Sequence, residues 1–150
     1  MDKPQAGRRV PLTIGQKASR TMTVTSAHVK AYAEMTGDYN PLHFDAAFAA
    51  RTKFGKLVAQ GGLTTGILHA LVAMDMPGPG TVFLSQNWKF TAPVFIGDTI
   101  TAITEVVDKR ESKSRPEWGI VTFVHKGVNQ RGEVVAICRR QAMMLKKRAA

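Results

Sequence analysis

The segment that begins at Gly61 is apolar on nearly every side of a helix, and no other feature of the sequence constrains the fold as strongly. A helix at a protein surface keeps its apolar residues on one face, whereas a helix that is apolar all round has to be covered on every side. We therefore predict a central buried helix that opens at Gly61 and Gly62 and ends before a turn at Pro77–Gly80. Its apolar surface is expected from Leu63, Ile67, Leu68, Leu71 and Val72.

Four long runs with the composition of strands follow this helix. Each run is rich in Val, Ile, Thr or aromatic residues, and a turn-forming segment separates it from the next. Such runs predict an antiparallel meander, which is expected to wrap around the single buried helix and to give an α+β domain. One side of such a sheet needs cover, so we also expect a homodimer or a larger homo-oligomer. The predicted strands are Thr81–Phe90, Thr99–Asp108, Gly119–Val128 and Val134–Leu145.

The whole chain of 150 residues has the length of one domain. Its first half adds a strand and two short helices, whose bounds follow from alternation and from capping residues. We expect residues 1–13 to be loose and residues 146–150 to form a basic tail. The added elements are a strand at Ala18–Val24, a helix at His28–Met35 capped by Thr25 or Ser26, and a helix at Ala46–Arg51 capped by Asp45.

Composition excludes several classes of protein. Cys138 is the only cysteine, so no internal disulfide can form, and no ligand-like neighbours suggest a zinc site. No apolar run approaches the ~20 residues that cross a bilayer, and the charged first residues lack the apolar core of a signal peptide. We expect no metal, no membrane partner and a cytoplasmic location.

The formal net charge of +10 fits several kinds of anionic partner, among them nucleic acid, an anionic membrane and a phosphorylated small molecule. Aromatic residues make up only 7% of the sequence and are not interleaved with basic ones, which argues against a surface on which bases stack. We therefore expect no nucleic-acid partner. The densest basic cluster lies at the C-terminal end and comprises Arg139, Arg140, Lys146, Lys147 and Arg148.

Asp38, Asn40 and His43 place a carboxylate, an amide and an imidazole within six positions. The segment from Asp38 to Leu42 is expected to be irregular, because Asn40 precedes a proline. A carboxylate can accept a proton from water, an imidazole with a reference pKa of about 6.5 can pass one either way, and an amide can orient both. Taken alone, the same residues also fit an ordinary turn with a partly buried structural histidine. The residues themselves leave both interpretations open.

The residues around this segment form a longer pattern, which consists of Tyr32, Met35, Thr36, Gly37, Asp38, Asn40, Pro41, Leu42, His43 and Ala49. This pattern resembles the signature of a known family, the MaoC-like, R-specific enoyl-CoA hydratases. Gln60–Leu63 is similar to the segment where that family opens its central helix, and Phe90–Thr99 is similar to a later turn of the family. The resemblance extends from about Ala18 to the last predicted strand.

The resemblance implies a single hot-dog domain and a hydro-lyase activity. The implied reaction adds water to a trans-2-enoyl-CoA to give an (R)-3-hydroxyacyl-CoA, or runs in reverse. Asp38 and His43 would bind and activate the water, and Asn40 would hold them in place. The backbone N–H of Gly61, with Gly62 beside it, would stabilise the negative charge that develops on the thioester oxygen.

The implied partner is an acyl-CoA thioester, and since coenzyme A is part of the substrate, no further cofactor is expected. Coenzyme A carries phosphates, so basic side chains near the site are useful. Arg51, Lys53 and Lys56 follow the catalytic segment and are candidates, although a solvated surface would explain the same residues.

The chain departs from the family pattern at two positions, so the resemblance does not determine the length or branching of the substrate's acyl group. Gln60 stands where many relatives carry histidine, and His69 stands where some place a small polar residue. Two alternatives to a hydratase also stay open, namely another acyl-CoA enzyme on the same fold, such as a thioesterase, and a non-catalytic acyl-CoA-binding module.

Overall fold

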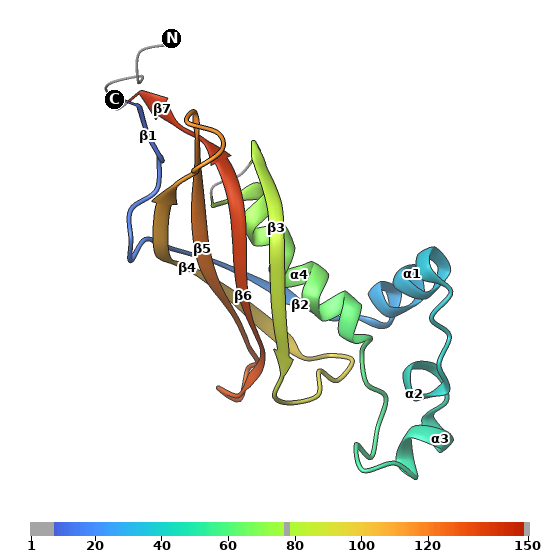
Figure 1. Cartoon of the computed structure of the whole chain (residues 1–150). Helices are drawn as coiled ribbons and strands as arrows, with labels where there is room; N and C mark the ends of the chain where they lie inside the picture. The colour runs from blue at the N-terminus through green and yellow to red at the C-terminus, as the bar shows by residue number, and fades with distance from the viewer. Residues whose placement is uncertain (1–7, 77–78, 149–150) are drawn as a thin grey trace.

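A single long helix, α4 (Gly61–Met74), lies against one face of a five-stranded antiparallel sheet in the computed structural model, which describes residues 8–76 and 79–148 (Figure 1). The strands are β2 (Lys17–Thr23), β3 (Thr81–Phe90), β4 (Thr99–Glu111), β5 (Trp118–Val128) and β6 (Val134–Leu145). Their order across the sheet is β2-β4-β5-β6-β3. This is the α+β architecture that the sequence predicts.

Strand β3 does not take the place that a meander would give it. Strands β4, β5 and β6 follow one another across the sheet, but β3 pairs with β6, with Phe90 opposite Ala136. The connection from β3 to β4, residues 91–98, crosses the end of the sheet, where Thr91 donates to the carbonyl of Val135 (Figure 1). A connection longer than a hairpin turn permits this crossing. The predicted meander is therefore correct for three strands and wrong for β3.

The side of α4 that faces the sheet is buried. Leu68 is fully buried in the main core cluster, and Leu63 and Ile67 pack partly buried against it. Gly66 and Met74 are exposed, so one chain alone leaves part of the predicted buried helix uncovered. The side chains of two further residues predicted for this core, Leu71 and Val72, lie outside the described residues.

Polar side chains also lie on the inner face of the sheet. Thr104, His125 and Arg140, on three neighbouring strands, are fully buried. The basic cluster expected at the C-terminal end is therefore divided. Arg140 points inward and Arg139 is exposed, because alternate residues of a strand face opposite sides. Lys146 is buried as well, in an ion pair with Glu111.

Three short helices, α1 (Ser26–Thr36), α2 (Pro41–Phe44) and α3 (Ala46–Ala50), gather beside the first turn of α4 (Figure 1). Thr25 caps α1 and Asp45 caps α3, as predicted. The segment expected to be irregular up to Leu42 turns helical at its proline instead. A proline in the first position of a helix loses no hydrogen bond, and the Asn40 side chain accepts from the Leu42 N–H at 3.0 Å.

Part of the N-terminal segment expected to be loose is ordered. Arg8–Arg9, strand β1, pairs with Lys147–Arg148, strand β7, and Leu12 is buried in a second core cluster. Burial of an apolar side chain explains why this segment is tied down. Residues 1–7, residues 77–78 of the predicted turn and residues 149–150 lie outside the described part of the chain. No helix within that part is both long and apolar enough to cross a membrane.

Candidate active site

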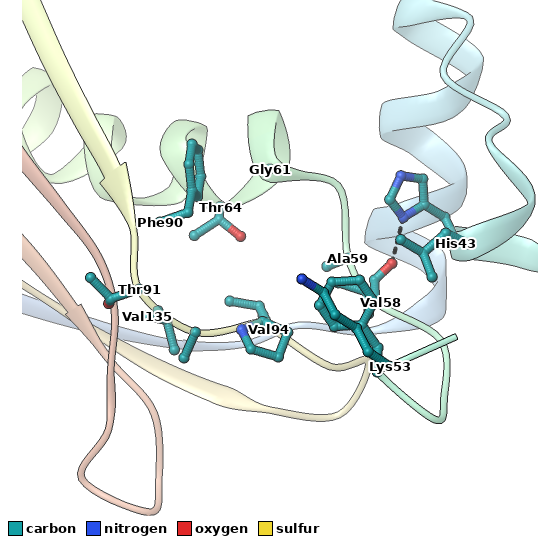
Figure 2. Close-up of a pocket in the computed structure, with 14 residues that line it drawn as sticks. His43, Lys53, Val58, Ala59, Gly61, Thr64, Phe90, Thr91, Val94 and Val135 are labelled. Carbon is teal, nitrogen blue, oxygen red and sulfur yellow. Dashed lines mark hydrogen bonds between the residues drawn. The ribbon is translucent and has the colours of Figure 1, made fainter. Parts of the chain in front are cut away.

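A pocket of about 440 Å³ opens where α4 begins. Gly61 and Thr64 form one wall, and His43 and Lys53 lie on the side opposite Val135 (Figure 2). Most of the remaining wall is apolar, which suits a hydrocarbon chain. The full lining is Leu42, His43, Lys53, Phe54, Val58, Ala59, Gly61, Thr64, Phe90, Thr91, Ala92, Pro93, Val94 and Val135.

His43 is oriented by a backbone carbonyl. Its Nδ1 lies 2.6 Å from the carbonyl oxygen of Val58, as the dashed line in Figure 2 shows. Because a carbonyl oxygen only accepts, Nδ1 carries the proton, and Nε2 of the neutral ring is left as an acceptor. The side chain is 11% exposed, so most of the ring is shielded from solvent. A histidine held in this way can take up a proton at Nε2.

The carboxylate of Asp38 faces that nitrogen. Its Oδ2 lies 3.7 Å from Nε2 of His43, which is too long for a direct hydrogen bond and short enough for one water to contact both. Asn40 supports both groups. Its backbone N–H donates to Oδ1 of Asp38 at 3.3 Å, and its side chain caps the helical turn that carries His43. The structure therefore brings these three predicted residues together.

Gly61 and Gly62 begin α4, and neither N–H donates to an acceptor among the described residues, as expected for the first turn of a helix. Gly61 lines the pocket, whereas Gly62 does not. A Cβ atom on Gly62 would lie 2.7 Å from Cζ of Tyr32, so close packing against α1 requires glycine there. A Cβ atom on Gly61 would meet nothing closer than 3.4 Å, at the Phe90 ring.

Of the three predicted basic residues, only Lys53 lines the pocket. Its ammonium group lies 5.2 Å from the ring of Phe54, and that of Lys56 lies 4.3 Å from the ring of Phe95. Arg51 is exposed at the end of α3. The structure thus does not gather the three around one point. Across residues 8–76 and 79–148, no group of three His, Cys, Asp or Glu side chains could hold a metal ion.

The two positions that depart from the family pattern lie outside the pocket wall. Gln60 is fully buried, and its Nε2 donates to the carbonyl of Val29 at 2.9 Å, which ties the start of α4 to α1. His69 lies two turns further along α4 and packs edge-on against the ring of Phe83, 4.3 Å away. Burial, together with the charge of Arg140, lowers the pKa of His69. Both departures are therefore built into the packing around α4.

Eleven of the fourteen residues of the pocket wall were not predicted as site residues, among them Thr64, Val94 and Val135. Thr64 follows Gly61 by three positions and so lies on the same face of the helix, a spacing that could have identified it. Val94 lies inside the turn at 90–99 that resembles the family. Val135 reaches the pocket only because β6 pairs with β3, and no local pattern indicates that pairing.

Asp98 holds the turn that closes the pocket on the side of Val94. The residue is 4% exposed, and its carboxylate accepts from the Phe95 N–H at 3.0 Å, from Gln130 at 2.8 Å and from Arg131 at 3.1 Å. Burial acts to raise the pKa of Asp98, but these hydrogen bonds and the charge of Arg131 outweigh it and lower the pKa. The ionised carboxylate therefore stabilises the turn.

The sequence matches the family model of the MaoC like domain over residues 11–129. It is 41% identical over 102 residues to an (R)-specific enoyl-CoA hydratase of Aeromonas caviae, a match that covers 68% of this chain and 76% of that protein. It is 36% identical over 124 residues to a 3-hydroxybutyryl-CoA dehydratase of Methylorubrum extorquens, covering 83% of this chain and 79% of that one.

The structure is similar to that of an R-hydratase from Pseudomonas aeruginosa. The two superpose with a TM-score of 0.80 and 33% sequence identity, over 92% of this chain and 85% of the other. The hot-dog fold implied by the sequence is thereby confirmed.

Proposed function

This chain belongs to the MaoC-like domain family, and we propose that it adds water across the double bond of a trans-2-enoyl-CoA to give the (R)-3-hydroxyacyl-CoA, or catalyses the reverse dehydration. The hydratase and the dehydratase named above are hydro-lyases, and this chain is an enzyme of the same class. The observation that carries the proposal is the pair of Asp38 and His43. Oδ2 of Asp38 lies 3.7 Å from Nε2 of His43, and His43 lines a mostly apolar pocket.

In the proposed mechanism, one water molecule binds between the carboxylate of Asp38 and Nε2 of His43. The thioester carbonyl makes C3 electrophilic, so the water oxygen forms a bond to C3 while the π electrons move toward the carbonyl oxygen. Nε2 of His43, held as an acceptor by the bond from Nδ1 to Val58, takes one proton from the water. That proton ends on C2 as the enolate collapses, so nothing is oxidised or reduced.

We assign stabilisation of the enolate oxygen to the backbone N–H of Gly61. It lies in the pocket wall at the start of a 14-residue helix, where unpaired N–H groups and the helix dipole favour negative charge. A single donor of this kind contributes about 3 kcal/mol to transition-state stabilisation. The N–H of Gly62 belongs to the same turn and is the second candidate, although packing against Tyr32 accounts for glycine at that position.

Lys53 is the basic side chain best placed to meet a phosphate of coenzyme A, because it lies at the edge of the pocket that also holds His43. Arg51 and Lys56 lie outside the pocket wall. Exchange of Lys53 for Ala is expected to raise KM with little change in kcat, since it would remove binding that ground state and transition state share.

Crotonyl-CoA distinguishes the proposed hydratase from its alternatives. Loss of enoyl absorbance without release of free thiol would support hydration. Release of free thiol would show a thioesterase, because attack would then have occurred at the carbonyl carbon. Binding of the thioester without either change would show a non-catalytic module.

We further propose that the protein forms a homodimer along β3. This strand lies at the edge of the sheet, so one side of its backbone has no partner strand within the described chain. Large apolar side chains are exposed there, with Val82 and Leu84 at 49% and Phe90 at 58%, and Met74 of α4 is 64% exposed. Light scattering is expected to give twice the mass of one chain, and a monomer at every concentration would contradict the proposal.

A further inference from the structure

Arg140 of β6 is fully buried on the inner face of the sheet, and no carboxylate of the described residues pairs with its charge. None of its three guanidinium nitrogens has a hydrogen-bond partner within residues 8–76 and 79–148. An arginine stays protonated in a protein, and a buried charge is costly unless it is paired. The position therefore calls for an acceptor from outside the described chain.

The groups around Arg140 are aromatic rings, imidazoles and a thiol, and none of them carries a negative charge. The ring of Phe83 lies 4.5 Å from the guanidinium carbon, and His69 packs edge-on against the same ring. Nε2 of His125 is a fourth buried nitrogen without a partner among the described residues. Burial lowers the pKa of His125 to about 3, so this imidazole is neutral at pH 7 and offers Arg140 no counter-charge. Cys138, two residues before Arg140 on the same face of β6, also interacts with it, but a thiol is only a weak acceptor.

Helix α4 and strand β6 both contribute to the pocket wall, and both also carry residues of the group around Arg140. Gly61 of α4 and Val135 of β6 lie in the pocket wall, and His69 and Arg140 lie further along the same helix and strand. From residue 61 to residue 69 the helix rises by ~12 Å, at ~1.5 Å per residue. His69 and Phe83 are only half-buried, so displacement of either ring would uncover the guanidinium. An acyl chain that extended from the pocket along α4 and β6 would reach the region of His69 and Arg140.

We propose that Arg140 selects acyl-CoA substrates that carry a carboxylate at the end farthest from the thioester, that is, mono-thioesters of dicarboxylic acids. The two oxygens of a carboxylate match the two parallel N–H bonds that a guanidinium group offers. A neutral acyl chain of the same length would leave the buried charge unpaired. That the bound thioester is a substrate for hydration rests on the proposed function. Binding of its carboxylate by Arg140 does not depend on that function.

Calorimetric titration with saturated thioesters tests recognition separately from catalysis, because these ligands cannot be hydrated. Adipoyl-, suberoyl- and sebacoyl-CoA are compared with hexanoyl-, octanoyl- and decanoyl-CoA, each pair equal in carbon number. For at least one pair, the dicarboxylic ligand is expected to bind more tightly by about tenfold or more, as a hydrogen-bonded charge pair would give. Equal or tighter binding of the neutral ligand in every pair would overturn the proposal.

Two variants refine the test. Arg140→Met is expected to abolish the difference within each pair, and Arg140→Lys to keep part of it. Arg139→Met is the matched control, because Arg139 is the exposed neighbour on the same strand, and it is expected to keep the difference. A difference that survives in Arg140→Met would overturn the proposal. If that variant does not fold, the comparison of ligands on the wild-type protein decides alone.

Rates with the corresponding trans-2-enoyl thioesters complete the test. Hydration of the carboxylated substrate with a kcat/KM at least about tenfold above that of the neutral one would confirm the substrate class. Absence of hydration for every substrate would refute the proposed function, and the titrations would still decide whether Arg140 recognises a carboxylate.

Discussion

Nε2 of His43 and Oδ2 of Asp38 lie 3.7 Å apart, and neither atom forms a hydrogen bond to another residue in the described part of the chain. The second nitrogen of the imidazole and the second oxygen of the carboxylate each take part in a hydrogen bond. Nδ1 of His43 donates to Val58, and Oδ1 of Asp38 accepts from the backbone of Asn40. Each side chain is thus fixed through one atom and presents the other to the same point.

Asp38→Asn and His43→Gln are each expected to lower kcat for crotonyl-CoA by about 10²- to 10⁴-fold, because each removes one proton acceptor from the bound water. The double variant should be little worse than either single one, since the two groups act on the same water. Initial rates followed by enoyl absorbance measure this. The matched control is Asp45→Asn, because asparagine caps a helix as well as aspartate does. Loss of activity in that control alone would contradict the assignment.

Gly62→Ala is expected to destabilise the protein by about 1–3 kcal/mol, because the added Cβ would overlap the ring of Tyr32. Gly61→Ala should have a much smaller effect on stability, since its nearest contact would be at 3.4 Å. Urea unfolding of both variants measures the difference. Tyr32→Leu combined with Gly62→Ala should recover part of the loss, and equal stability of the two single glycine variants would contradict the packing argument.

Asp98→Asn is expected to lower the free energy of unfolding at pH 7 by about 1–3 kcal/mol, because it weakens three hydrogen bonds to a buried carboxylate. The pKa of Asp98 is lowered in the folded state, so its contribution is present above the unfolded value of 3.8 and is lost as the pH falls through the folded value. Wild type and variant should therefore converge in acid. Asp108 is an exposed carboxylate within β4, and Asp108→Asn is the control, which should change the free energy of unfolding very little.

His125 predicts a second dependence on pH. Its folded pKa of about 3 lies below the ordinary value of 6.5, so the unfolded chain takes up a proton first as the pH falls. The free energy of unfolding should then decrease between pH 6.5 and about 3, by up to ~1.4 kcal/mol per pH unit from this group. Urea unfolding across this window should give a shallower slope for His125→Gln than for wild type. Parallel slopes would show that His125 is not the cause.

The strands could be predicted because alternation and turn residues are local signals. Thr81–Phe90 and Val134–Leu145 begin and end where the sequence predicts. The pairing of these two strands could not be predicted, because it depends on a crossing connection whose hydrogen bonds join residues far apart in the chain. The ordering of Leu12 escaped prediction for the same reason, since the core that buries it comes from distant strands.

The acid–base residues could be found because Asp38, Asn40 and His43 lie within six positions and match a family signature. Arg140 could not be assigned in the same way. In the sequence it adjoins Arg139 and reads as part of a basic surface cluster, and only the register of β6 separates the two side chains. Burial alternates from Cys138 to Ala142, as the two-residue period of a strand requires. Counting Arg140 from Cys138 would therefore have placed it on the buried face, whereas grouping it with its basic neighbours placed it on the surface.

The antiparallel pairing of β1 with β7 brings Arg9 opposite Lys147, so the path of the backbone through the described residues almost closes into a ring (Figure 1). The arrangement of the helices and strands in space should then depend little on where the chain begins and ends. A circular permutant that joins these two strands by a short linker and opens at the exposed turn 113–116 would retain every residue of the pocket wall and is expected to keep the same fold.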